Sequence, residues 1–153
     1  MNAYKFFLEF HSGLRYIVLV LIVVAILRAF AGWLGNQSYT DGNRKWNLFT
    51  MISVHTQFLL GLILYFLSPN VKFVSGFMKD ASLRYWAVEH ISMMLIAVVL
   101  ITIGHSKSKK ALNPANKHKA IAIFYTIATV IIIVAIALMT KDVPGRTFFG
   151  ITH

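Results

Sequence analysis

The chain has 153 residues, of which 58% are hydrophobic and only 13% are charged, and its mean hydropathy is +0.68. This composition excludes an ordinary soluble domain and indicates an integral membrane protein in a lipid bilayer. A formal charge of +10 suggests a nucleic-acid partner, but the basic residues lie in short segments between apolar stretches. Anionic lipid headgroups are the more natural counter-charge, so no nucleic acid is expected.

Cysteine is absent, which excludes disulfides, iron–sulfur clusters and thiolate metal sites. The six histidines are therefore the main source of strong metal ligands. No polar interval is long enough to fold separately, so we expect a single transmembrane domain over residues 1–153. Four apolar stretches predict an all-α fold, an integral membrane four-helix bundle.

The first membrane span is expected over residues 4–34. Its first turns carry Glu9, His11 and Arg15 ahead of a continuous apolar run, and no small-residue cleavage site follows. We therefore expect this segment to be retained, not removed as a signal peptide. His11 and Arg15 are four residues apart, so they share one face of the helix.

The second span is expected over residues 46–67, and Ser68-Pro69-Asn70 ends it. His55 lies nine residues in from Trp46, too deep to reach water easily. It is either a ligand or a neutral histidine hydrogen-bonded to a neighbouring helix, for example to a serine hydroxyl. Gln57 is two positions away and so lies on a different face. Residues 71–83 are expected to lie along the membrane surface.

The third span is expected over residues 84–105 and carries ionisable residues at both ends. His90 and His105 are fifteen residues apart, which leaves them roughly 60° apart around the helix and about 22 Å apart along it. His105 can act as a ligand only if its helix continues past Gly104. An ionisable residue inside the membrane is a functional hypothesis in itself.

The fourth span, residues 120–139, carries only Tyr125 and a few threonines as polar groups, which predicts packing and lipid contact. His118 precedes it among lysines and is expected to be a solvated loop residue. The tail from residue 140 to 153 is expected at the interface, and the terminal His153 is uninformative.

Four spans place both termini on one side of a membrane. Eight Lys and Arg residues lie on the opposite side and seven on the terminal side, but five lysines are concentrated between Ser106 and Lys119. This cluster favours a cytoplasmic loop. We expect a multi-pass protein of a bacterial inner (cytoplasmic) membrane with both termini extracytoplasmic.

His11 and His90 lie at equal expected depth, each about seven residues inside its helix. Two imidazoles at equal depth on facing helices can clamp a haem iron axially. Arg15 and Arg84 can neutralise the anionic haem propionates. The alternative is that His11 contacts lipid headgroups.

Glu89 is costly if ionised in lipid. It is expected to pair with Arg15 or Arg84, to be protonated, or to face an aqueous pocket. It can receive a proton from a quinol or orient the ring of a ligand histidine. A simple interfacial ion pair is the alternative.

Four short motifs span the chain: His11-Ser-Gly-Leu-Arg-Tyr16, His55-Thr-Gln-Phe-Leu-Leu-Gly-Leu-Ile-Leu-Tyr65, Glu89-His90 and Gly104-His105-Ser106. Together they resemble a family of short bacterial four-helix membrane proteins labelled cytochrome b-like. The resemblance implies haem b, one or two per chain, held by His11, His55, His90 and His105. His118 has no counterpart in it.

These observations predict a b-type cytochrome-like membrane protein that transfers electrons in or near a respiratory chain, with a larger respiratory complex or a quinone as partner. Whether it is an enzyme in its own right stays open. A cofactor-free structural or assembly subunit of a membrane complex is the first alternative. A small transporter or metal-handling protein is the second, although the spans lack internal helix-breaking residues.

Overall fold

The structure is a computed structural model that describes residues 2–150, and these residues form helices and no strand. Four helical stretches are long and apolar enough to cross a bilayer. They are α1 (Ala3–Leu34), α2 (Asp41–Leu67), the stretch Ala81–Lys110 and α5 (Pro114–Asp142). The predicted all-α fold with four membrane spans is therefore confirmed.

The third span is a composite of three consecutive elements. It begins with α3 (Ala81–Arg84), continues through the π-helix η2 (Tyr85–Glu89) and ends with α4 (His90–Lys110). A short 3-10 helix, η1 (Phe77–Lys79), precedes it in the segment between α2 and α3. The π-helical turn directly before His90 is a rare element that occurs frequently at functional sites.

Three helices are longer than the boundaries predicted from apolarity, because capping residues and not hydropathy set where a helix begins. Thr40 Oγ1 accepts from the amide of Asn43 at 3.2 Å, so α2 begins at Asp41 and not at residue 46. Asn113 Oδ1 accepts from the amide of Asn116 at 2.9 Å, with Pro114 in the first turn. Side-chain capping of this kind satisfies amides that have no partner within the helix.

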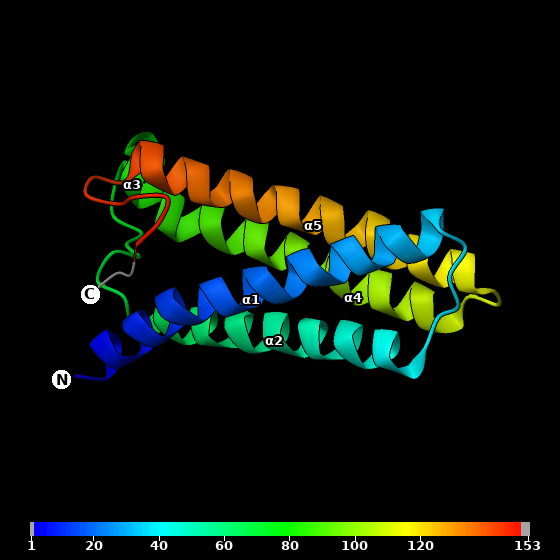
Figure 1. The fold of residues 1–153 in the computed structure, drawn as a ribbon. Coiled ribbons are helices and arrows are strands. Elements are labelled where there is room, and N and C mark those ends of the chain that lie inside the picture. Colours follow the sequence, from blue (N-terminus) through cyan, green and yellow to red (C-terminus); the bar gives the residue numbers. More distant parts are fainter. Residues whose placement is uncertain (1, 151–153) are drawn as a thin grey trace.

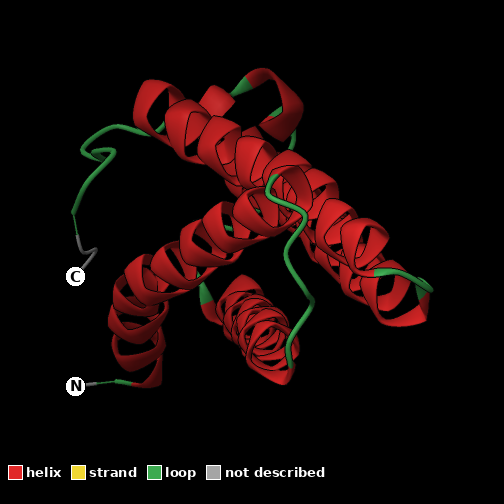
Figure 2. Cartoon of the chain, turned by 45° about the vertical axis from the view of Figure 1, so that its right-hand side comes forward, coloured by secondary structure: helices red, strands yellow, loops and turns green. Residues whose placement is uncertain are grey.

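In the bundle, α1 packs against both α2 and α5, while α4 packs along α5 and also contacts α2. Figure 2 shows α1 crossing between α2 on one side and the α4–α5 pair on the other. Small residues let the helices approach closely. A methyl group at Gly104 of α4 would lie 2.5 Å from Phe124 Cβ of α5.

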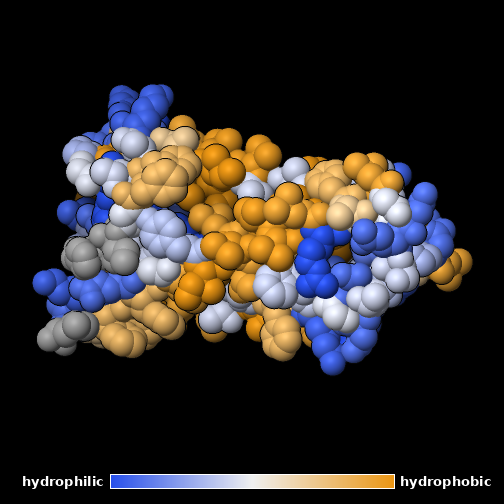
Figure 3. Space-filling view, viewed as in Figure 1, coloured by the Kyte–Doolittle hydropathy of each residue, from blue (hydrophilic) through white to orange (hydrophobic). Residues whose placement is uncertain are grey.

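The outer surface matches a bilayer environment. Figure 3 shows a hydrophobic middle with hydrophilic residues gathered at the two ends, and Val20 and Leu27 of α1 remain 61% and 64% exposed. The start of α1 and the end of α5 lie at one end of the bundle (Figure 1), which we call the terminal end. The end that carries the α1–α2 and α4–α5 connections is the loop end.

Candidate functional site

The structure brings His11 of α1 and His90 of α4 together near the terminal end. Their ring centroids are 6.5 Å apart, and the ring planes are inclined at 84°. Both line a cavity of about 160 Å³ between α1, α2, the third span and α5. The sequence predicted this pair from equal depth alone, and the two rings do meet.

Tyr85 determines which nitrogen of His90 carries the proton. The Tyr85 hydroxyl donates to the carbonyl oxygen of Ala135 at 2.8 Å, so its single proton is already used. Its contact of 3.2 Å with His90 Nδ1 therefore has His90 as the donor. This leaves Nε2 unprotonated, the form in which a histidine binds a metal.

The π-helix η2 explains why Tyr85 reaches His90. In an α-helix, residues five apart are about 140° apart around the axis and do not face each other. A π-helix closes its hydrogen bonds between residues five apart, here from the His90 amide to the Tyr85 carbonyl. Residues 85 and 90 therefore lie on one face, and sequence reasoning with α-helical periodicity missed this contact.

The same turn pairs Arg84 with Glu89, which are also five residues apart. Arg84 Nε lies 2.7 Å from Glu89 Oε1, and Arg84 also donates to the carbonyl oxygen of Met78. Of the alternatives predicted for Glu89, the ion pair with Arg84 is the one observed. Neither residue lines the cavity with His11, and the acceptor for the His90 ring is Tyr85, not Glu89.

Arg15 lines the cavity beside His11, as their four-residue spacing predicted. It donates to the hydroxyl of Tyr16 at 3.0 Å and to the carbonyl oxygen of Gly150 at 2.7 Å. A second cation, Arg146, also lines the cavity and stacks over the Trp86 ring at 5.5 Å. Sequence reasoning missed Arg146, because it belongs to the tail and no local pattern links it to His11.

Three buried polar atoms on this cavity have no hydrogen-bond partner among the described residues: His11 Nδ1, Arg15 Nε and Gln57 Oε1. Gln57 donates through its nitrogen to the carbonyl oxygen of His11 at 2.7 Å. Gly61, one turn further along α2, leaves room for the His11 ring, since a methyl group there would lie 3.2 Å from its Cε1. Unsatisfied buried polar atoms are rare and call for an explanation such as a ligand.

The separation of the two imidazoles suits one metal ion. About 2 Å from metal to nitrogen and about 1 Å from nitrogen to ring centre, on both sides, gives roughly 6 Å between centroids. Within residues 2–150 no group of three or more His, Cys, Asp or Glu side chains could hold a metal ion. The described residues therefore offer two ligands of these types here, His11 and His90.

The structure does not bring His55 and His105 into a second pair. Thr102 donates its hydroxyl proton to the carbonyl oxygen of Val98, so His55 Nε2 donates to Thr102 Oγ1 at 2.8 Å. This is the interhelical hydrogen bond of the non-ligand alternative, made to a threonine. Among the described residues no ring contact joins His55 to His105.

His105 fulfils the condition that its helix continues past Gly104, since α4 extends to Lys110. It lines a different, polar cavity at the loop end. Its Nδ1 is buried and has no hydrogen-bond partner in the part of the chain that the structure describes.

The prediction that His118 is a solvated loop residue is wrong. His118 is 2% exposed, donates through Nε2 to the carbonyl oxygen of Ser38 at 3.1 Å and packs against the Tyr39 ring. The reason is a tertiary contact: Gly32 of α1 has no side chain, and the His118 ring fills that space. His153 lies outside the described residues.

No protein-family model matches this chain, and neither a curated protein nor a solved structure is detectably similar to it. The candidate site is therefore defined by the geometry of this chain alone.

Proposed function

We propose that the protein is a b-type cytochrome-like membrane protein in which His11 and His90 hold one haem. The observation that carries the proposal is the 6.5 Å separation of two imidazoles from facing helices within one cavity. His11 and His90 would hold the haem iron, since histidine is a ligand that haem iron takes from proteins. Haem b, when bound, supplies one-electron oxidation and reduction.

Each residue of the site has a distinct part in this proposal. Tyr85 holds the His90 ring through Nδ1 and keeps Nε2 free for the metal. Arg15 and Arg146 supply positive charge beside the cavity, suited to the two anionic propionates. The remaining wall is largely apolar, including Leu19, Val54 and Ile132, and keeps water from the metal site.

We assign one haem only. With four candidate histidines, a second haem would have His55 and His105 as its ligands, but the described contacts give that pair no support, because His55 Nε2 is already hydrogen-bonded to Thr102. Electron transfer in or near a respiratory chain, with a larger complex or a quinone as partner, follows from the haem and belongs to the same proposal.

The test is the spectrum of the purified protein. Protein isolated in mild detergent from haem-sufficient cells is expected to show low-spin b-type bands in the dithionite-reduced minus oxidised spectrum. Folded protein without haem would refute the proposal. It would favour the cofactor-free structural or assembly subunit, which the interhelical hydrogen bond of His55 already suits.

We further propose that the loop end faces the cytoplasm of a bacterial cell and the terminal end the outside. The support is charge: five lysines lie between Ser106 and Lys119. A reporter inserted near Asn113 is expected to be cytoplasmic and a reporter at the C-terminus extracytoplasmic. The opposite pair of results would reverse the orientation.

A further inference from the structure

A second cavity lies at the loop end, at the opposite end of the bundle from the His11–His90 site. Its volume is about 210 Å³, and its walls come from three separate parts of the chain. The α1–α2 connection and the start of α2 supply Tyr39, Thr40, Asp41 and Arg44, the end of α4 supplies His105 and Lys109, and the start of α5 supplies Lys117. A space of this volume is large enough for a small polar group.

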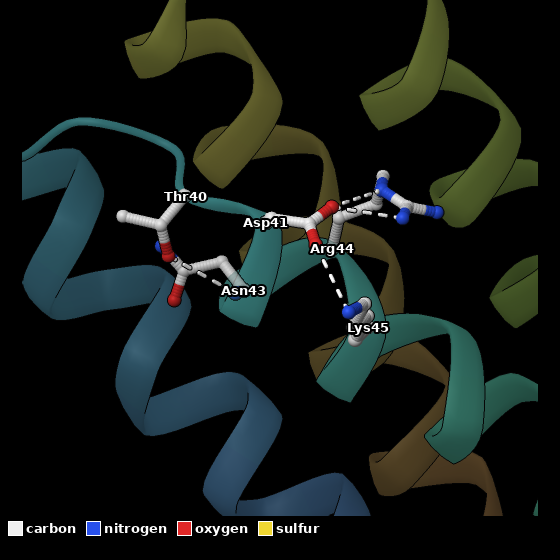
Figure 4. Close-up of polar contacts among 5 residues, drawn as sticks. All are labelled: Thr40, Asp41, Asn43, Arg44 and Lys45. Carbon is white, nitrogen blue, oxygen red and sulfur yellow. Dashed lines mark hydrogen bonds and ion pairs between the residues drawn. The ribbon is translucent and has the colours of Figure 1, made fainter.

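The charge on these walls is unbalanced. Three cations, Arg44, Lys109 and Lys117, face one carboxylate, Asp41, which leaves a formal charge of +2. Asp41 is moreover shared: it lies 2.8 Å from Arg44 and 3.1 Å from Lys45, and Figure 4 shows its carboxylate between the two bases. One acid therefore serves two cations, and Lys109 and Lys117 have no carboxylate partner among the described residues.

Several donors on the walls are already held in position. Lys117 Nζ donates to the carbonyl oxygens of Ser108 and Lys109 and lies over the Tyr39 ring at 5.7 Å. The Tyr39 hydroxyl accepts from Asn47, and within residues 2–150 no acceptor takes its proton. His105 Nδ1 is likewise buried without a partner. Donors fixed in advance lose less entropy when a ligand binds.

We infer that this cavity binds a phosphate group. A phosphate monoester carries about −1.5 to −2 charges and three strong acceptor oxygens at neutral pH, which matches a formal charge of +2 and donors on several sides. A carboxylate is planar and has two acceptor oxygens, so it reaches fewer of these donors, and its single negative charge balances only half of the formal charge of +2. The phosphate has two possible sources at a membrane surface, the phosphomonoester headgroup of phosphatidic acid and a soluble phosphate.

The test uses the full-length protein in nanodiscs and a matched pair of neighbouring exposed lysines. Lys109 lines the cavity and Lys110 does not, so we compare Lys109→Gln with Lys110→Gln. One arm titrates inorganic phosphate into protein in phosphatidylcholine nanodiscs by calorimetry, against chloride at equal ionic strength. The other arm uses native mass spectrometry to count phosphatidic acid retained from mixed nanodiscs.

We expect saturable binding of one phosphate group per chain in at least one arm. Lys109→Gln is expected to weaken it about tenfold, as the loss of a charge-assisted hydrogen bond does, while Lys110→Gln leaves it unchanged. Binding of inorganic phosphate identifies a soluble ligand, whereas retention of phosphatidic acid alone identifies a lipid headgroup.

Absence of specific binding in both arms would overturn the inference, and so would equal weakening by the two lysine variants, since that indicates surface charge only. Lys117→Gln against Lys119→Gln gives a second matched pair should Lys109→Gln fail to fold. Either result is independent of the haem proposal, because the two cavities share no residue.

Discussion

The two ends of the bundle use the same side chain in different ways. At the terminal end, His11 and His90 lie against one cavity. His11 Nδ1 has no hydrogen-bond partner among the described residues, and the His90 ring is hydrogen-bonded through Nδ1, which leaves Nε2 available to a metal. Toward the loop end, His55 donates to a threonine hydroxyl and His118 to a carbonyl oxygen, while His105 lines a basic cavity. The two groups differ in which ring nitrogen is hydrogen-bonded: His90 uses Nδ1, whereas His55 and His118 use Nε2.

Removing either histidine of the terminal pair is the largest change expected. His11→Ala and His90→Ala should each abolish the haem, measured as haem per protein by the pyridine haemochrome assay. Insertion should persist, because it depends on the hydrophobicity of the spans. His55→Ala is the matched control and should keep the haem. Equal loss of haem in all three variants would contradict the assignment of His11 and His90 as ligands and of His55 as a structural residue.

Tyr85→Phe tests the residue that orients His90. Loss of such a supporting hydrogen bond typically lowers metal affinity 10–100-fold, so we expect weaker haem retention on dilution or competition with apomyoglobin. Tyr125→Phe is the control, since Tyr125 is also a buried tyrosine that donates to a carbonyl oxygen, that of Asn47, and contacts no histidine. Indistinguishable retention in the two variants would count against Tyr85 as a positioning residue.

Gly32→Ala tests the structural use of histidine at the loop end. A methyl group there overlaps the His118 ring, so we expect a loss of about 1–3 kcal/mol in the free energy of unfolding, seen as a lower melting temperature in detergent. The haem spectrum should not change. Gly13→Ala has nothing within 4 Å of the new methyl and should be neutral or slightly stabilising; a Gly32→Ala variant as stable as Gly13→Ala would contradict the packing described.

The smallest expected effect is electrostatic. Reduction adds a negative charge that a nearby cation stabilises, so Arg15→Ala should lower the haem reduction potential by tens of millivolts, on the order expected for a partly screened charge. Arg15→Lys should retain most of the potential. Arg28→Ala, on the same helix near the loop end, should leave it unaltered, and an unchanged potential in Arg15→Ala would remove Arg15 from the haem site.

The sequence predicted those features that follow from counting residues along a regular helix. Apolar stretches long enough for a bilayer predicted the four spans. Equal depth predicted that His11 and His90 meet, because depth follows from counting residues along a helix of known rise. The spacing of four between His11 and Arg15 predicted a shared helix face, and both residues line the same cavity.

Features that depend on irregular turns or on distant segments were not predictable in this way. The π-helix at Tyr85–Glu89 changes which residues share a face, so the contact between Tyr85 and His90 was missed. His118 looked solvated because its sequence neighbours are lysines, whereas its burial depends on Gly32, far away in sequence. Arg146 reaches the cavity from the tail, and no periodic pattern anticipates such a contact.

The most direct test of the central claim is the low-temperature EPR spectrum of the oxidised purified protein. If His11 and His90 hold a haem, its oxidised iron would be low-spin and would give a low-spin signal. We predict this signal in the wild-type protein and its loss in His90→Ala. A high-spin signal, or folded protein that contains no iron, would contradict the assignment of His11 and His90 as a haem-binding pair.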